Sequence, residues 1–314
     1  MRVHYGIENI QRIRNPVVTV GCFDGVHIGH QVIVNRLNEI AEHIRGESVL
    51  ITFYPHPRKV LYPNSYGRTL QFINSQKEKI SLLRRSGLNH CIIVKFTIEF
   101  SRVSPELFVR NFLVSKLNAK YVVVGFNHFF GHNKQGNSNY LSDLGKELGF
   151  EVEEILEQDV HKEKVSATTI REALKQGKIS RTNLYLNHPY FIIGDVGLGS
   201  PSFATIGFPT LMVQIEEASK LIPPDGIYAV SVNWGSFEYK ALCIIWREND
   251  QSAQPLDAPN VEISILNFDR NYPEEEVTIY FRSRIIQNAN VTNLELLREQ
   301  LNRAVMLINE KKID

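Results

Sequence analysis

Two histidines on either side of a glycine have the types and the spacing to bind a phosphate group. Residues 21–30 read GCFDGVHIGH, which places His27 and His30 three residues apart with Gly29 between them. Imidazoles at this spacing can both donate hydrogen bonds to one phosphate and its leaving oxygens. Charge builds up on those oxygens when a phosphorus is displaced, and fixed donors then lower the barrier. The segment therefore predicts a nucleotide phosphate site formed by Gly21, Phe23, Asp24, His27, Gly29 and His30.

The elements around this segment predict a sheet that presents it to a ligand. Residues 17–23 form a short, β-branched, apolar run, as expected of a buried parallel strand. A helical pattern follows directly and stops at Gly46. In doubly wound sheets ligands bind outside the carboxyl ends of the strands, where a helix N-terminus offers free N–H groups to phosphate.

The first half of the chain continues this alternation of strand and helix. Ser104 and Pro105 have the types of a helix cap and first turn. Five strands with helical crossovers predict a doubly wound α/β domain with a parallel sheet. The expected strands are 17–23, 49–54, 91–94, 121–124 and 151–155, and the expected helices include 77–85 and 140–148.

The second half has a different rhythm, in which strand-like runs are separated by turn-rich segments. This pattern favours an antiparallel barrel or sandwich, and one amphipathic helix closes the chain. We place the domain boundary so that residues 1–186 form the first domain and residues 187–314 the second. The expected strands are 191–196, 210–215, 227–232, 241–246, 261–268 and 277–281.

Composition narrows the class of protein. The 314 residues include 35 Lys and Arg against 34 Asp and Glu, a formal net charge of +1. No charge bias indicates nucleic acid or membrane surfaces, so we expect small-molecule substrates and neither of those partners. Three scattered cysteines without a CxxC pair indicate neither a disulfide framework nor a zinc site, and a reducing cytoplasm is the default expectation.

The histidine pair has other readings. It could be half of a metal site, although no third ligand is evident, or its members could merely cap a helix. A dehydrogenase is disfavoured because the GxGxxG fingerprint is absent.

The chain resembles a known family at four ordered motifs. HxGH after a first strand is similar to the nucleotidylyltransferase superfamily, and GCFDGVHIGH resembles the FAD synthetase (FMN adenylyltransferase) domain of bacterial bifunctional riboflavin kinase/FAD synthetases. Three more segments resemble this family in the same order. They are ITFYPHPRKVL at 51–61, VVVGFNHFFGHNKQGN at 122–137 and VSATTIREAL at 165–174.

This resemblance implies roles for the residues of the first domain. His27 and His30 would stabilise the transition state at the α-phosphate of ATP, and Asn127 would lie near the reacting phosphates. Hydroxyls and a guanidinium at a helix start suit ATP phosphates, the role implied for Ser166, Thr168 and Arg171. The adenine or flavin side would be shaped by Pro55, His56 and Pro57. Two departures are Ala167, in place of a serine, and Lys134, where arginine is common.

The second domain resembles a riboflavin kinase barrel with several marks missing. GFPT at 207–210 and VEISILNF at 261–268 match, which implies Glu262 as catalytic base and Thr210 as a Mg²⁺ ligand. Leu211 and Met212 stand where Ala-Asn should follow, and Phe203-Ala204 replace a Gly-Arg pair. The segments IIWREND at 244–250 and IIQN at 285–288 share almost nothing with the family's NIGxRPT and LRDE. The losses fall on polar positions, so we expect a barrel whose kinase site is impaired.

Four functions follow from these observations. The leading one is an FMN adenylyltransferase that makes FAD and pyrophosphate from FMN and ATP, with Mg²⁺ shielding the phosphates. A fully bifunctional riboflavin kinase/FMN adenylyltransferase is the second. A flavin-binding or regulatory paralogue without catalysis is the third. Nucleotidyl transfer to another acceptor is the fourth, since the histidine chemistry is indifferent to the nucleophile.

Overall fold

The chain forms two compact units in a computed structural model. The structure describes residues 1–8, 10–126, 128–157, 159–160, 163–247, 259–267 and 276–310. One unit comprises residues 1–71 and 79–166, and the other comprises 72–78 and 167–314. Helices α8 and α9, which the sequence boundary assigned to the first domain, thus group with the second unit, and a boundary at residue 186 stays a prediction.

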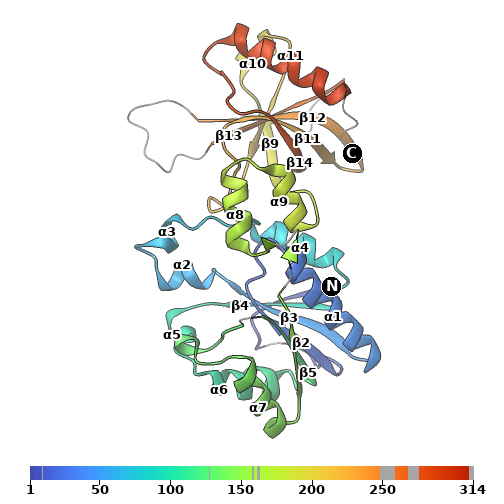
Figure 1. The fold of residues 1–314 in the computed structure, drawn as a ribbon, viewed down its shortest axis with the longest axis vertical. Coiled ribbons are helices and arrows are strands. Elements are labelled where there is room, and N and C mark those ends of the chain that lie inside the picture. The colour runs from blue at the N-terminus through green and yellow to red at the C-terminus, as the bar shows by residue number, and fades with distance from the viewer. Residues whose placement is uncertain are drawn as a thin grey trace. The chain divides into compact units, whose positions relative to one another are not determined.

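The first unit is built on a parallel sheet of six described strands in the order β1-β4-β3-β2-β5-β6 (Figure 1). All five predicted strands are present, which confirms the doubly wound α/β class. The strands are β1 (Arg2–Tyr5), β2 (Pro16–Val20), β3 (Glu47–Tyr54), β4 (His90–Lys95), β5 (Tyr121–Gly125) and β6 (Glu151–Ile155). A two-stranded ribbon, β7 (Asp159–Val160) with β8 (Glu163–Lys164), follows them.

Helices cover both faces of this sheet, because alternate residues of the buried strands point to opposite sides. Val17 packs with α1, whereas Val18 packs against the face covered by α6, η1 and α7. The helices are α1 (Ile28–His43), α2 (Pro57–Leu61), α3 (Tyr66–Thr69), α4 (Gln76–Arg85), α5 (Ile98–Ser101), α6 (Pro105–Phe108), the π-helix η1 (Val109–Lys116), the 3-10 helix η2 (His132–Lys134) and α7 (Ser138–Leu148). The predicted cap is present: the Ser104 hydroxyl accepts from the Leu107 amide.

The second unit is a closed antiparallel barrel in the order β10-β13-β12-β11-β14-β9, which confirms the predicted β-barrel. The closing helix α11 packs on it through Leu297, Leu301, Ala304 and Ile308. The strands are β9 (Phe191–Leu198), β10 (Leu211–Gln214), β11 (Gly226–Trp234), β12 (Phe237–Trp246), β13 (Asn260–Ile265) and β14 (Glu276–Ile286). The helices are α8 (Ala167–Lys175), α9 (Ile179–Leu186), α10 (Pro201–Thr205) and α11 (Leu294–Glu310).

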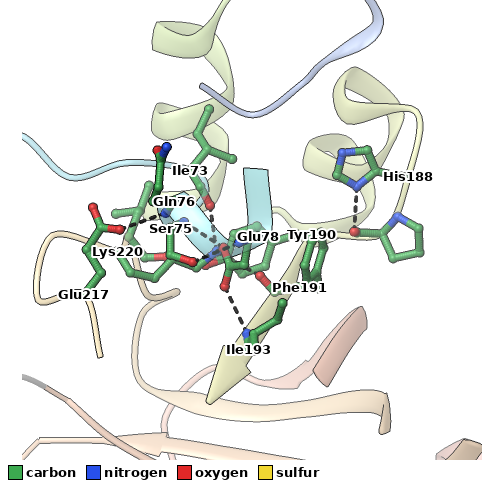
Figure 2. A network of polar contacts seen from close by, with 12 residues as sticks. Ile73, Ser75, Gln76, Glu78, His188, Tyr190, Phe191, Ile193, Glu217 and Lys220 are labelled. Carbon is green, nitrogen blue, oxygen red and sulfur yellow. Dashed lines mark hydrogen bonds and ion pairs between the residues drawn. The ribbon is translucent and has the colours of Figure 1, made fainter. Parts of the chain in front are cut away.

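A fully buried ion pair fixes residues 72–78 in the second unit (Figure 2). The Lys220 ammonium lies 2.5 Å from a Glu78 carboxylate oxygen, and both side chains have no exposed area. Lys220 also donates to the carbonyls of Ile73 and Phe191, at 2.7 and 2.8 Å. Glu78 accepts from the Ile193 amide at 3.0 Å. A pair so fully hydrogen-bonded is the arrangement in which buried charges are tolerated.

Candidate functional site

The segment predicted to bind phosphate is a turn with unusual backbone geometry at the carboxyl end of β2. Three of its residues have positive φ angles: Phe23 at 51°, Gly25 at 89° and Val26 at 40°. Such angles are uncommon for a residue other than glycine and rare for a β-branched one. The turn starts from a hydrogen bond between the Gly21 amide and the Ile51 carbonyl, 3.0 Å long. Strained backbone of this kind is concentrated at functional sites.

Strand order places this turn at the switch point of the sheet. Strand β2 lies between β3 and β5. The chain runs from β2 to β3 and then β4 on one side, and it crosses back to β5 and β6 on the other side. A crevice outside the carboxyl end of the central strand is where open α/β sheets bind ligands. Helix α1 begins directly after the turn, so its first amides face the same region.

The two histidines are stacked on each other. Their ring centroids are 3.7 Å apart with 20° between the planes, and the Phe23 ring stacks on His30 at 4.4 Å. His27 is the N-cap residue of α1 but makes no side-chain cap hydrogen bond. This observation disfavours simple capping as the role of His27.

His30 is held in its neutral form. Burial, with His27 and Lys79 close by, holds the pKa of His30 well below its usual value of 6.5. Its Nδ1 is buried, and no hydrogen-bond partner for that atom lies in the described part of the chain. A neutral imidazole has one donor and one acceptor nitrogen, so His30 can donate a hydrogen bond to a phosphate oxygen without being a cation.

Gly29 lies against the His27 ring and leaves little room for a side chain. A Cβ atom at position 29 would lie 3.2 Å from Cε1 and 3.3 Å from Nδ1 of that imidazole. Contacts of that length are tighter than most real Cβ contacts, so a side chain there would push the ring. The glycine therefore allows the two histidines to stack.

The sequence did not identify Lys79 as part of this site. The side chain is only 8% exposed. Its ammonium donates to the Cys22 carbonyl at 3.2 Å and to the Thr52 hydroxyl at 3.3 Å. The sequence placed Lys79 correctly in a helix but gave no signal that this lysine turns inward. Its helix lies between the second and third predicted strands of the parallel sheet, and that position was the available clue.

The PHP segment forms the connection from β3 to α2. The Tyr54–Pro55 peptide is cis, and Pro57 occupies the first turn of α2. His56 caps this helix, because its Nδ1 accepts from the Arg58 amide at 3.1 Å. Pro55 is exposed and the other two are half-buried, so the segment is accessible to solvent at the end of β3.

The remaining predicted ATP contacts do not all lie in the unit that carries the histidines. Asn127 lies outside the described residues. Ser166 ends the first unit, whereas Thr168 and Arg171 lie on α8 in the second unit. Thr168 is exposed and Arg171 is buried. Their roles stay predictions.

The two residues predicted for the kinase site, Thr210 and Glu262, lie together in the barrel. Glu262 of β13 is fully buried and accepts from the Thr210 hydroxyl at 2.5 Å. It also accepts from the Ser200 hydroxyl at 2.6 Å and from the Ser200 amide at 3.0 Å. The structure thus brings Thr210 and Glu262 together, and it adds Ser200, which the sequence did not indicate.

Two family models match the two halves of the chain. The FAD synthetase family matches residues 9–169, and the riboflavin kinase family matches residues 186–311. The "Bifunctional riboflavin kinase/FMN adenylyltransferase" of Bacillus subtilis (strain 168) is 31% identical over 289 residues, which cover 91% of this chain and 89% of that protein.

The chain belongs to the bifunctional riboflavin kinase/FMN adenylyltransferase family. A relative of the same name from Buchnera aphidicola subsp. Schizaphis graminum (strain Sg) is 28% identical, with coverage of 99% of this chain and 98% of that protein. The solved structure entitled "Crystal Structure of Macrolide-efflux Protein from Streptococcus pneumoniae" is 25% identical and superposes with a TM-score of 0.88, with coverage of 99% of both chains. None of the helices in the described ranges combines the length and apolarity needed to cross a bilayer.

Several residues that stand where the resemblance implies polar kinase residues are buried in the barrel unit. Phe203 is 2% exposed and packs in the cluster beneath α11. Leu211 is likewise buried. Ile244 and Ile245 are buried strand residues of β12, and residues 248–250 lie outside the described part of the chain. These buried side chains contribute to the packing of the barrel.

The alternative hypothesis of a metal site at His27 and His30 lacks further ligands among the described residues. Within the ranges that the structure describes, no group of three or more His, Cys, Asp or Glu side chains is arranged to hold a metal ion. The histidines lie in a stacked pair instead of converging on one point.

Proposed function

We propose that the first unit transfers AMP from ATP to FMN and thereby makes FAD and pyrophosphate. The observation that carries this proposal is the stacked pair of His27 and His30, held at the switch point of the FAD synthetase sheet. The family match indicates FMN as the acceptor of AMP, and the two histidines offer hydrogen-bond donors to the reacting phosphate.

The reaction is a displacement at the α-phosphorus of ATP. A phosphate oxygen of FMN forms the new P–O bond, and the bond to the β-phosphate oxygen breaks, so pyrophosphate leaves with the bonding electrons. Negative charge grows on the α-phosphate oxygens and on the leaving oxygen in the transition state. Donation from His27, His30 and the first amides of α1 would stabilise that charge.

Several finer assignments belong to this proposal. Mg²⁺ would enter bound to the ATP phosphates, as part of the substrate, and would neutralise charge there. Asn127 and the side chains of Ser166, Thr168 and Arg171 are proposed as further contacts of the ATP phosphates. Pro55, His56 and Pro57 are proposed to border the adenine or flavin.

Riboflavin phosphorylation by the second unit is the second candidate activity. The riboflavin kinase match over residues 186–311 and the retained contact between Thr210 and Glu262 favour the fully bifunctional enzyme. Oxygen ligands such as these suit Mg²⁺, which prefers hard donors. The opposing prediction of an impaired kinase rests on apolar residues at positions where the resemblance implies polar ones. A further observation in its favour is that Ser200 makes two hydrogen bonds to Glu262.

One set of incubations tests both activities. The purified full-length chain is incubated with MgATP and either FMN or riboflavin, and the products are separated by chromatography. We expect FAD and pyrophosphate from FMN. FAD from riboflavin would establish the bifunctional enzyme and refute impairment. If neither substrate gives a product while flavin still binds, the non-catalytic paralogue is correct instead.

A further inference from the structure

Lys79 ties together two chain segments at the candidate phosphate site. Its ammonium is 3.2 Å from the Cys22 carbonyl and 3.3 Å from the Thr52 hydroxyl. The same hydroxyl donates to the Cys22 carbonyl at 3.3 Å. Cys22 opens the strained turn after β2, and Thr52 lies near the end of the neighbouring strand β3. Two donors from separate elements, the Lys79 ammonium and the Thr52 hydroxyl, thus meet at the Cys22 carbonyl oxygen.

Burial of the Lys79 ammonium costs free energy of folding. A buried lysine loses hydration and the rotamer freedom of a long side chain. The Cys22 carbonyl and the Thr52 hydroxyl accept hydrogen bonds from this ammonium and offset part of that cost. Lys79 also acts electrostatically on His30, which places its charge close to the stacked rings. A fixed cation there complements the negative charge of a nucleotide phosphate.

We propose that Lys79 is a positioning residue for adenylyl transfer, acting through the turn that carries His27 and His30. This inference rests on the proposed function. Lys79 holds the Cys22 carbonyl against the end of β3, and the turn is thereby fixed in the conformation from which α1 and its histidines start. Misplacing catalytic donors by a fraction of an ångström lowers the rate more than it weakens substrate binding.

The test compares three substitutions in the full-length chain. Lys79→Met removes the ammonium and keeps most of the apolar stem. Lys79→Arg restores the charge, and Thr52→Val removes one acceptor with little change in shape. Lys77→Met is the matched control, because Lys77 lies on the same helix but is exposed and pairs on the surface with Glu276. Each variant is measured for kcat, for the dissociation constant of ATP and for backbone amide exchange of residues 21–26.

We expect Lys79→Met to lower kcat by about 10²-fold while the ATP dissociation constant changes by less than about threefold. Lys79→Arg should recover at least about a tenth of the wild-type kcat, and Thr52→Val should lose about three- to tenfold. Lys77→Met should match the wild type. Amide exchange of residues 21–26 should accelerate at least about tenfold in Lys79→Met and remain unchanged in Lys77→Met.

Two outcomes overturn the inference. If Lys79→Met weakens ATP binding in proportion to its loss of kcat/KM and leaves kcat intact, Lys79 is an ATP ligand and not a positioning residue. If amide exchange of residues 21–26 is unchanged, Lys79 does not hold the turn. The exchange comparison needs no turnover, so it decides the point even when the wild-type chain makes no FAD and the proposed function has failed separately.

Discussion

The imidazole rings of His27 and His30 stack with their centroids 3.7 Å apart. One ring belongs to the N-cap residue of α1 and the other to its first turn. Because the rings touch, a change that displaces one displaces the other, and the two act as one unit. Their common support is the turn after β2, so a small substitution in that turn should displace both rings.

Adding one methyl group beside this pair should impair catalysis without unfolding the protein. In Gly29→Ala the new Cβ would lie 3.2 Å from Cε1 of His27, so the ring must shift. We expect kcat for FAD formation to fall at least about tenfold, since misplaced donors lose transition-state stabilisation. Steady-state kinetics with FMN and MgATP provides the measurement.

Gly197→Ala is the control for that substitution. Among the described residues, a Cβ at position 197 would contact the Gln214 side chain alone, at 3.9 Å, and position 197 lies in the barrel. We expect its FAD formation to equal that of the wild type. Equal kinetics for Gly29→Ala and Gly197→Ala would contradict the packing argument.

Much of the architecture could be predicted from the sequence because its signals are strong. The β-branched residues 17–20 and 122–124 are buried in strands β2 and β5, and such runs are hard to place elsewhere in a fold. Strand β1 was missed because Arg2–Tyr5 is short and mixed in exposure. It is defined by its long-range pairing with β4, from Arg2 opposite His90 onward, and a local pattern does not contain that information.

The candidate sites were predictable to a smaller extent. The residue types in 21–30 indicate phosphate chemistry, but the inward turn of Lys79 and the hydrogen bonds from Ser200 to Glu262 depend on tertiary packing. Lysine and serine are usually exposed, so no sequence pattern marks the few that are not. The same limit applies to Glu78 and Lys220, which lie far apart in the chain and meet only in the folded unit.

Stability of the first unit should fall as the solution is acidified. Burial lowers the pKa of His128 from 6.5 to about 4. A histidine with a depressed folded pKa favours the folded state fully above the unfolded pKa, and this contribution is lost as the pH falls from 6.5 through about 4. From this group alone we expect a loss of about 2 kcal/mol in the free energy of unfolding between about pH 7.5 and about pH 5.

Urea unfolding followed by circular dichroism at the two pH values measures this loss. The glutamine in His128→Gln does not titrate. Between the two pH values, the free energy of unfolding of this variant should therefore fall by about 2 kcal/mol less than that of the wild type. Identical pH dependence in the two proteins would rule out His128 as the cause.

Removing one partner of the buried pair should strongly destabilise the barrel unit. Lys220→Met leaves the Glu78 carboxylate buried without its cation, and we expect a cost of about 3–5 kcal/mol. Both tryptophans of the chain, Trp234 and Trp246, lie in β11 and β12, so their fluorescence reports on this unit. Lys240→Met, at an exposed position of β12, is the control and should change stability by less than about 0.5 kcal/mol. Similar denaturation midpoints for the two variants would show that the pair contributes little.

The rate of FAD formation from FMN and MgATP, compared between the wild-type chain and His30→Ala, tests the central claim most directly. The account predicts that the wild type releases FAD and pyrophosphate in equal amounts. It also predicts that His30→Ala keeps the folded circular dichroism spectrum while turnover falls at least about 10²-fold. A folded His30→Ala variant with near-normal turnover would contradict the assignment of adenylyl transfer to the stacked pair.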